Sequence, residues 1–423
     1  MHVETDTATN WLRMAARDAR EASGQLARMP AAARNAALVA AAAALRRHAP
    51  AIAEANAADL AAFDAGRGTP AFRDRLALTP ARIAAMAQGL DDIAALPDPL
   101  GRVLADWTRP NGLRIQRIAT PIGVIGMIYE SRPNVGADAA GLCLKSGNAV
   151  ILRGGSESFR SARAIHAALL EGLQQGGVPA AAIAIPPETD RAYVGAMLGG
   201  AGLIDLIIPR GGKSLVQRVQ AEARVPVLAH AEGLCHTYVH AAADPAMARR
   251  VLANAKMRRT GVCGATETLL IDAAVAPSLL PLLTADLRAL GCDFRADARA
   301  RAICPELPAA AAGDFDMEWL DAVLSVAVVD GVAAALAHIH RHGSEHTDAI
   351  ITEDAAAAAQ FLAGVDSAVA LWNASTQFCD GGEFGFGAEI GIATGRIHAR
   401  GPVGLEQLTT FRYVLTGSGQ VRP

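Results

Sequence analysis

The 423-residue sequence lacks the features that mark several large classes of protein. Its six cysteines include no CxxC pair, which argues against a zinc site and against a redox dithiol. The formal net charge is only −3, so the strongly basic composition typical of nucleic-acid-binding proteins is missing. No uncharged apolar run reaches the length of a membrane span, and residues 192–204 are short and rich in glycine.

A secretory signal is also missing. The first ten residues, MHVETDTATN, are polar and acidic and have neither a basic start nor an apolar stretch. We therefore expect a soluble, cytoplasmic protein without membrane or nucleic-acid partners and without a disulfide framework. One or two thiols are then candidates for chemistry, and the others are expected to be small buried hydrophobes. The six are Cys143, Cys235, Cys263, Cys292, Cys304 and Cys379.

The bulk composition favours a large folded α/β protein. Hydrophobic residues make up 52% and charged residues 19%, so the chain can bury a sizeable core. Its length exceeds that of one compact core and predicts two large lobes. Residues 5–98 are rich in alanine and are predicted to be helical, with apolar residues at helical spacing.

The pattern changes near residue 121 to alternating strands and helices. Apolar strands are predicted at 121–130, 148–155, 183–187, 203–212 and 225–230, with a helix over 156–175. This alternation predicts a doubly wound parallel sheet. A helix over 244–257 and a strand over 267–272 restart the pattern, which predicts a second α/β lobe extending to about residue 392.

Between these regions, residues 106–118 contain two short alternating runs around Asn111-Gly112, a strong signal for a β-hairpin. The hairpin could add a strand to a neighbouring subunit, or it could pack on its own domain; both interpretations stay open. The tail over 403–417 is strand-like and could pair with this hairpin, its own or a neighbour's.

Cys263 is the most conspicuous candidate for chemistry. It lies between Gly261 and Gly264 in the segment RRTGVCGATETLL, where glycine allows close approach of a ligand to the backbone. Arg258 and Arg259 could hold the thiol as its reactive thiolate. The alternative is a buried, inert cysteine.

Two glycine turns are candidates for binding anions. Residues 153–156 read Arg-Gly-Gly-Ser at a strand end before a helix, and residues 210–213 read Arg-Gly-Gly-Lys. A helix N-terminus favours phosphate, although neither turn is a G-x-G-x-x-G motif and both could be ordinary solvated turns. His338, His340, His342 and His346 have no supporting Cys or carboxylate pattern, so we expect a polar helix end and no metal site.

Taken together, these segments resemble the γ-glutamyl phosphate reductase family, a branch of the aldehyde dehydrogenase superfamily. The resemblance covers nearly the whole chain through residues 121–135, 145–158, 230–240, 254–270, 343–352 and 373–417. It implies an α/β, aldehyde-dehydrogenase-like fold with two doubly wound lobes and a small β oligomerisation element. The implied parts are a cofactor domain (1–105 and 121–243), a catalytic domain (244–395), and an oligomerisation hairpin and tail (106–120 and 403–417).

The resemblance also implies a reaction. In this family γ-glutamyl phosphate and NADPH give glutamate-5-semialdehyde, NADP and phosphate, a step of proline biosynthesis. Cys263 would be the nucleophile that forms a thioester, and Asn134 with backbone N–H groups would stabilise the developing oxyanion. A homo-oligomer and transient contact with glutamate kinase are further implications.

The resemblance assigns binding roles to single residues. Arg153, with serine and not an acid at position 156 (Ser156), suits the 2′-phosphate of NADP. The cofactor site would also include Gly154, Gly155, Gly211 and Gly212. Glu318 would contact the nicotinamide ribose. Substrate candidates are Arg259, Lys213, Ser344 and His346, with Arg132 and Arg400 as further cations.

An oxidising aldehyde dehydrogenase acting on another substrate is the alternative. It would need a glutamate base to activate water. Here the corresponding segment, residues 230–233, reads His-Ala-Glu-Gly and places His230 at that position.

Overall fold

The computed structural model describes residues 2–66, 70–230 and 232–422. The chain forms two compact units, each assembled from separate segments. Unit 1 comprises residues 1–229, 385–391 and 403–423, and unit 2 comprises residues 230–384 and 392–402. Among the described residues, no helix is both long and apolar enough to cross a membrane.

Unit 1 begins with helices, as the alanine-rich sequence predicts. They are α1 (His2–Leu26), α2 (Ala31–Arg47), α3 (Ala49–Ala65), α4 (Pro70–Leu76) and α5 (Pro80–Ala95). Thr79 caps α5 by accepting a hydrogen bond from the Arg82 N–H, and Pro80 occupies the first helical position, where a missing N–H costs nothing. Of these helices, α1 contacts the strands of the sheet that follows, and α2 packs against α5.

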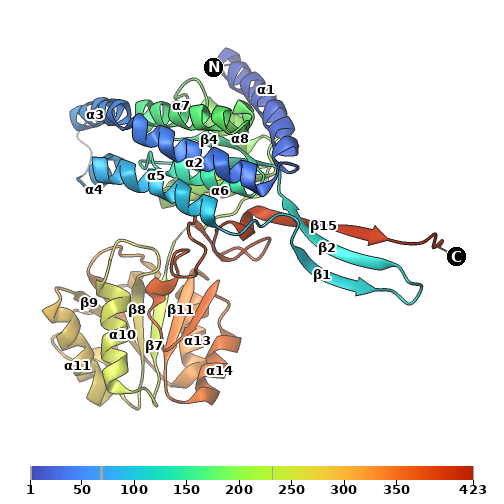
Figure 1. The fold of residues 1–423 in the computed structure, drawn as a ribbon. Helices are drawn as coiled ribbons and strands as arrows, with labels where there is room; N and C mark the ends of the chain where they lie inside the picture. Colours follow the sequence, from blue (N-terminus) through green and yellow to red (C-terminus); the bar gives the residue numbers. More distant parts are fainter. Residues whose placement is uncertain (1, 67–69, 231, 423) are drawn as a thin grey trace. The chain divides into compact units, whose positions relative to one another are not determined.

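The sheet of unit 1 is parallel, in the order β5-β4-β3-β6. Its strands are β3 (Val124–Tyr129), β4 (Ala149–Arg153), β5 (Ile183–Ala184) and β6 (Leu206–Arg210). The connecting helices are α6 (Val135–Lys145), α7 (Phe159–Gln175), α8 (Ala192–Leu198) and α9 (Lys213–Glu222). Leu12 of α1 and Met197 of α8 share one core cluster with Ile128 and Ile151 of the sheet. Figure 1 shows the course of these helices and strands in unit 1.

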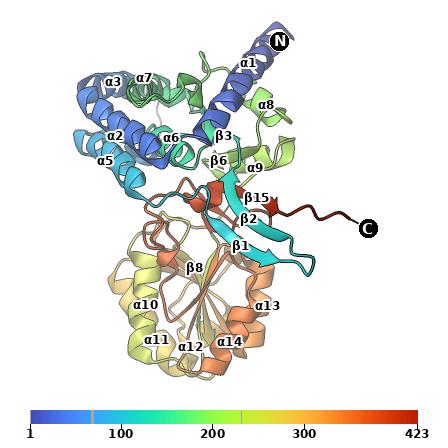
Figure 2. The same cartoon turned by 45° about the vertical axis from the view of Figure 1, so that its right-hand side comes forward.

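A separate three-stranded antiparallel sheet also belongs to unit 1. It has the order β1-β2-β15, from β1 (Val103–Thr108), β2 (Arg114–Pro121) and β15 (Thr409–Thr416). Gly112, at φ 84°, supplies the left-handed residue of the turn between β1 and β2. The predicted hairpin is therefore present, and the tail pairs with the hairpin of its own chain, as Figure 2 shows.

Unit 2 contains a six-stranded parallel sheet in the order β12-β11-β7-β8-β10-β9. The strands are β7 (Cys235–Val239), β8 (Thr266–Asp272), β9 (Asp293–Ala296), β10 (Val323–Val329), β11 (Thr347–Ile351) and β12 (Val369–Trp372). Helices α10 (Pro245–Met257), α11 (Ala276–Ala289) and α12 (Ala298–Ile303) pack into one core cluster. Helices α13 (Gly331–His342) and α14 (Ala355–Gly364) pack into another.

Two details of the expected organisation differ from the structure. The boundary between the lobes lies at residues 229 and 230, not at 243, because β7 pairs with β8 and β11 of unit 2. The strand expected at 225–230 is absent from the described chain there, where Val227 forms only an isolated bridge to Ile207. Pro226 lies beside this bridge and has no N–H for a ladder.

Candidate active site

The residues of the candidate site in unit 2 precede four neighbouring strands of its sheet. His230 precedes β7, Cys263 precedes β8, Glu318 precedes β10 and His346 precedes β11. Because these strands are parallel and adjacent, their amino ends lie along one edge of the sheet. The sheet topology thus gathers residues that are far apart in the sequence.

The loop that carries Cys263 connects α10 to β8. Gly233 packs against this loop so closely that a Cβ atom there would lie 2.0 Å from the carbonyl oxygen of Cys263. At Gly264 a Cβ atom would lie 3.2 Å from the carbonyl oxygen of Thr376. Glycine at these two positions therefore allows three backbone segments to meet around the thiol.

Gln377 fixes the beginning of the same loop. Its Nε2 donates to the carbonyl oxygens of Ala255 at 2.9 Å, Asn254 at 3.2 Å and Arg259 at 3.3 Å. Its Oε1 accepts a hydrogen bond from Arg258 at 3.1 Å. A single amide side chain thus binds several carbonyl groups at the end of α10, where most of the last carbonyl oxygens of a helix have no partner within the helix.

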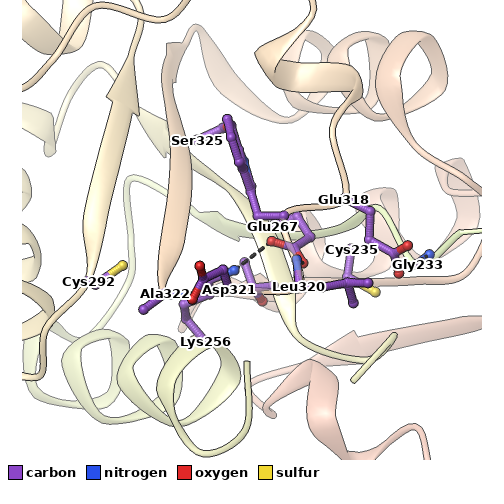
Figure 3. A network of polar contacts seen from close by, with 12 residues as sticks. Gly233, Cys235, Lys256, Glu267, Cys292, Glu318, Leu320, Asp321, Ala322 and Ser325 are labelled. Atoms are coloured by element: carbon purple, nitrogen blue, oxygen red, sulfur yellow. Dashed lines mark hydrogen bonds and ion pairs between the residues drawn. The ribbon is translucent and has the colours of Figure 1, made fainter. Parts of the chain in front are cut away.

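A buried ion pair closes the two ends of the loop. Lys256 at the end of α10 and Glu267 at the start of β8 are 0% and 1% exposed, and their charged atoms lie 2.5 Å apart. Glu267 also accepts a hydrogen bond from the backbone N–H of Leu320, at 3.1 Å. Figure 3 shows Lys256, Glu267 and Leu320 together. Burial raises the pKa of Glu267 to about 7, against the opposing effect of Lys256.

Glu318 lies in the segment that Glu267 anchors. Its carboxylate accepts a hydrogen bond from the Gly233 N–H at 2.8 Å (Figure 3). Gly233 in turn contacts the backbone of Cys263. The segment before β10 is therefore connected to the loop that holds the thiol through one side-chain-to-backbone hydrogen bond and the close packing of Gly233.

Two imidazoles lie beside the thiol. The ligand atoms of His230, Cys263 and His346 all lie within 4.8 Å of one another, and the two imidazole rings are 5.1 Å apart. His230 Nδ1 lies 2.7 Å from the carbonyl oxygen of Ile392, which can only accept, so Nδ1 carries the proton. The lone pair of a neutral His230 is therefore on Nε2.

Cys263 differs from the other cysteines in exposure. Cys263 is half-buried, whereas Cys143, Cys235, Cys292, Cys304 and Cys379 are buried. Burial raises the pKa of Cys143, Cys235, Cys292 and Cys304, which keeps these thiols protonated. Cys235 instead has a structural role, since its Sγ donates to the carbonyl oxygen of Cys263 at 3.1 Å.

Unit 1 contains the Arg153 turn at the carboxyl end of β4. The buried Arg153 donates to the carbonyl oxygen of Thr189 at 2.8 Å, and it lines a pocket with Tyr129, Gly154, Gly155 and Glu188. Its Nε atom is buried without a hydrogen-bond partner. Ser156 begins the short 3₁₀ turn before α7, as expected for a strand–turn–helix unit.

The second glycine turn, after β6, contains an acceptor that the sequence did not reveal. The Gly212 N–H donates to Glu130 Oε2 at 2.9 Å, and a Cβ atom at Gly211 would lie 2.4 Å from the same oxygen. Glu130 follows β3, the strand that neighbours β6. The anion at the N-terminus of α9 is thus a carboxylate of the chain itself, while Lys213 is the exposed first residue of the helix.

Asn134 also lies in unit 1, at the N-cap position of α6. Its side-chain amide donates to Asp138 Oδ2 at 3.1 Å. Burial raises the pKa of Asp138 to about 6, while Asn134 and Arg210 oppose the rise. The orientation of the Asn134 amide is therefore fixed by a carboxyl group one helical turn later.

The substrate candidates of unit 2 have several different environments. Ser344 Oγ accepts a hydrogen bond from the Leu234 N–H at 2.8 Å, which ties the loop before β11 to the segment before β7. Arg259 is exposed, and Arg400 is ion-paired with Asp366 and Glu345. Arg400 therefore stabilises a loop, which weakens the case for it as a substrate cation.

The histidines of α13 contact one another and their neighbours. The rings of His338 and His342 lie 4.6 Å apart, as their spacing predicts, and His342 Nδ1 is 2.7 Å from Asp316. His340 is exposed and contacts the carbonyl oxygen of Gly364. Of the four histidines in this stretch, His346 is the one that lies beside Cys263.

Comparison with known proteins decides the family. The model of the aldehyde dehydrogenase family matches residues 2–300. A γ-glutamyl phosphate reductase from Acidiphilium cryptum is 70% identical over 423 residues, 100% of both chains. One from Gluconobacter oxydans is 71% identical over 96% of this chain and 95% of its own. The chain belongs to the γ-glutamyl phosphate reductase family.

Solved structures agree with this membership. The crystal structure of the γ-glutamyl phosphate reductase from Thermotoga maritima has a TM-score of 0.95 at 40% identity, over 97% of this chain and 100% of that chain. An acetylating aldehyde dehydrogenase from Geobacillus thermoglucosidasius has a TM-score of 0.68 at 17% identity, over 99% of each chain. The aldehyde-dehydrogenase-like α/β fold expected from the sequence is confirmed.

Sequence reasoning missed residues that hold the backbone around the candidate sites in place. Lys256, Gln377 and Glu130 were not singled out, because their partners lie on other elements. One signal was available for Glu267, since a carboxylate near the start of the apolar strand TETLLID calls for a buried partner.

Proposed function

We propose that this chain catalyses the NADPH-dependent reduction of γ-glutamyl phosphate to glutamate-5-semialdehyde, with release of phosphate, as a step of proline biosynthesis. The observation that carries this proposal is the half-buried Cys263 thiol beside two imidazoles, on a loop braced by Gln377 and by a buried ion pair. The names of relatives at 70% and 71% identity support the substrate.

The first half of the reaction is acyl transfer to Cys263. His230 Nε2, whose lone pair is set by the Nδ1–H bond to Ile392, takes the thiol proton. The thiolate sulfur then forms a bond to the acyl carbon, and the bond from carbon to the phosphate oxygen breaks with its electron pair. Phosphate leaves, and a γ-glutamyl thioester stays on Cys263.

The second half releases the aldehyde. When bound, NADPH supplies the hydride that reduces the thioester. The resulting thiohemiacetal carbon stays bonded to Cys263 until its C–S bond breaks and the thiolate returns. Backbone N–H groups near Cys263, together with the Asn134 side chain, are the donors we assign to the oxyanion in both halves.

Features of unit 1 fit an NADP cofactor. Arg153 has a buried Nε atom without a partner and lines a pocket beside Gly154 and Gly155. Position 156 is a serine and not an acidic residue. The nearby Glu157 accepts a hydrogen bond from the Ser131 N–H at 2.7 Å. A guanidinium with its neighbouring carboxylate held by the backbone suits a 2′-phosphate. We assign Glu318 to the nicotinamide ribose. The turn at Gly211 and Gly212 is a poorer site for the pyrophosphate than its sequence indicates, because the Glu130 carboxylate already accepts the Gly212 N–H.

The remaining assignments concern substrate and assembly. Arg259, Lys213, Ser344 and His346 are our candidates for contacts with the glutamyl and phosphate groups. The three-stranded sheet β1-β2-β15 is our candidate for a homo-oligomer contact, because it exposes apolar side chains on its outer strands. These side chains are Val103, Trp107, Phe411, Tyr413 and Leu415.

Trapping the thioester tests the proposal directly. Glutamate kinase, ATP and glutamate generate γ-glutamyl phosphate in the presence of the protein, with NADPH omitted. After an acid quench, we expect peptide mass spectrometry to show a γ-glutamyl adduct on Cys263 in the wild type and in His340→Ala, a control that removes an exposed imidazole. Absence of the adduct from Cys263, or its presence on another cysteine, would overturn the nucleophile assignment.

A further inference from the structure

Cys263, His230 and His346 form a group with the composition of a metal site. Within the part of the chain that the structure describes, it is the one group of three His, Cys, Asp or Glu side chains whose ligand atoms lie within 4.8 Å of one another. All three residues belong to unit 2, so their arrangement depends on a single compact unit.

The donor set selects a particular class of cation. One thiolate sulfur and two imidazole nitrogens suit borderline-soft divalent ions such as Zn²⁺, whereas Mg²⁺ and Ca²⁺ prefer oxygen ligands. Tetrahedral Zn²⁺ with ordinary Zn–S and Zn–N bonds places its ligand atoms roughly 3.3–3.6 Å apart. The ligand atoms are at most 4.8 Å apart in the structure. Side-chain rotations that move each atom by about an ångström bring them to the distances of a zinc site, without movement of the sheet.

Each of the two imidazoles has a polar neighbour at its Nδ1 atom. His230 donates its Nδ1–H to the carbonyl oxygen of Ile392 in β13 (Ile392–Ala393), which leaves Nε2 as the ligand atom. This is the usual second hydrogen bond of a histidine that binds metal, and it fixes both tautomer and ring orientation. His346 is 0% exposed, and its Nδ1 lies 2.9 Å from the hydroxyl of Thr347 at the start of β11.

The third ligand is held on its own loop. Cys263 follows the helix end that Gln377 braces, and Gly233 packs against its carbonyl group. A cation bound to these three side chains would keep a fourth position for water, as in zinc sites with three protein ligands. Little ordering of the chain is then needed when the cation binds, since the elements around the ligands are already in place.

We propose that the ligand-free active site binds one thiophilic divalent cation, Zn²⁺, through Cys263, His230 and His346, and that the bound ion reversibly blocks the reaction. On binding, the Sγ–H proton is released to solvent and an S–Zn bond forms, with no change of oxidation state. The coordinated sulfur is then a much weaker nucleophile towards the acyl carbon, because its negative charge is shared with the cation. The Nε2 lone pair of His230 that takes the thiol proton is occupied by the S–Zn–N coordination. Only the inhibitory half of this inference rests on the proposed function.

Co²⁺ is a spectroscopic probe for the binding half, because a thiolate ligand gives a charge-transfer band in the near ultraviolet. The apoprotein is titrated with Co²⁺, and Zn²⁺ affinity is measured by competition with a chromophoric chelator. We expect one equivalent bound, loss of the band in Cys263→Ser, and at least about tenfold weaker Zn²⁺ binding in His230→Ala and His346→Ala. His340→Ala, which removes an exposed imidazole, should bind as the wild type does.

The result that would overturn the inference is the absence of the band, or Zn²⁺ affinity unchanged by all three substitutions. Circular dichroism checks that each variant is folded. In the activity arm, stoichiometric Zn²⁺ should abolish turnover, EDTA should restore it, and Mg²⁺ should have no effect. If the protein shows the cobalt–thiolate band but has no phosphate-dependent turnover, the metal site is supported and the proposed function is contradicted. If bound Zn²⁺ does not change the turnover, the inhibitory half of the inference is overturned.

Discussion

Cys263 combines the two conditions on which the reactivity of a thiol depends. It is half-buried, whereas the other five cysteines are buried. It also lies beside two imidazoles, either of which can take or share its proton. Cys235 shows the contrast, since burial raises its pKa far above the ordinary value and its sulfur donates to a backbone carbonyl group.

This difference predicts selective alkylation. Under native conditions iodoacetamide should modify one thiol rapidly, and peptide mapping should place the label on Cys263. Cys263→Ala should lose the rapid phase and keep only the slow labelling that accompanies unfolding. Rapid labelling of Cys304 or Cys379 in the folded wild type would show that exposure does not distinguish the candidate nucleophile.

Arg153 allows a second test at the residue scale. If its guanidinium binds the 2′-phosphate, Arg153→Ala should weaken NADPH binding by about ten- to hundredfold, the usual range for a lost charge-assisted hydrogen bond, with little change for NADH. Fluorescence titration with both nucleotides measures this. Arg191→Ala, which removes a charge on a neighbouring loop, is the control, and equal losses for the two nucleotides in Arg153→Ala would contradict the assignment.

At the scale of elements, the conformation of the Cys263 loop depends on residues that lie outside the loop. The buried pair of Lys256 and Glu267 joins the helix before the loop to the strand after it, and Glu267 also holds the Leu320 N–H. Removing one partner of a buried pair leaves an uncompensated charge, whereas removing both is far less costly.

Lys256→Met should therefore lower the free energy of unfolding by about 3–5 kcal/mol, and Lys256→Met with Glu267→Met should recover much of that loss. Urea unfolding measures both. Arg249→Met, which breaks the partly exposed pair with Asp286, should change the value by less than about 1 kcal/mol. A double variant no more stable than Lys256→Met alone would show that the pair does not act as a unit.

An element could be predicted from the sequence where the residues that determine it lie within the element itself. Helix α5 and the unit α10–loop–β8 follow from local signals, namely a Thr-Pro cap, helical spacing, and glycines before an apolar run. Residues 235–239 were assigned to the wrong lobe because a buried parallel strand has the same apolar pattern in either sheet. The convergence of His230, Cys263 and His346 depends on strand order, which spacing along the chain does not encode.

On the scale of the whole molecule, the candidate residues of the two units lie at opposite ends of the parallel sheet of each unit. In unit 1 the cofactor candidates follow β4 and β6, at the carboxyl ends, as is usual for open α/β sheets. In unit 2 the candidates for chemistry precede β7, β8, β10 and β11, at the amino ends. The sequence could be divided into two α/β lobes, but the usual rule for open α/β sheets points to the end of the second sheet opposite to the candidate residues.

The β1-β2-β15 sheet allows a prediction about assembly. If its exposed apolar side chains contact another subunit, Leu415→Arg should shift the protein towards monomer in light scattering after size-exclusion chromatography. Leu290→Arg is a matched control, since Leu290 and Leu415 are both 55% exposed and Leu290 lies on unit 2. An unchanged mass for Leu415→Arg, or dissociation by Leu290→Arg, would contradict the assignment of this sheet.

The most direct test of the central claim uses the reverse reaction. The protein is given glutamate-5-semialdehyde, in equilibrium with its cyclic imine, together with NADP, and NADPH absorbance is followed with phosphate present and absent. The account predicts NADPH formation that requires phosphate and disappears in Cys263→Ala. Formation without phosphate would contradict it, because water would then resolve the thioester and the chain would be an oxidising aldehyde dehydrogenase.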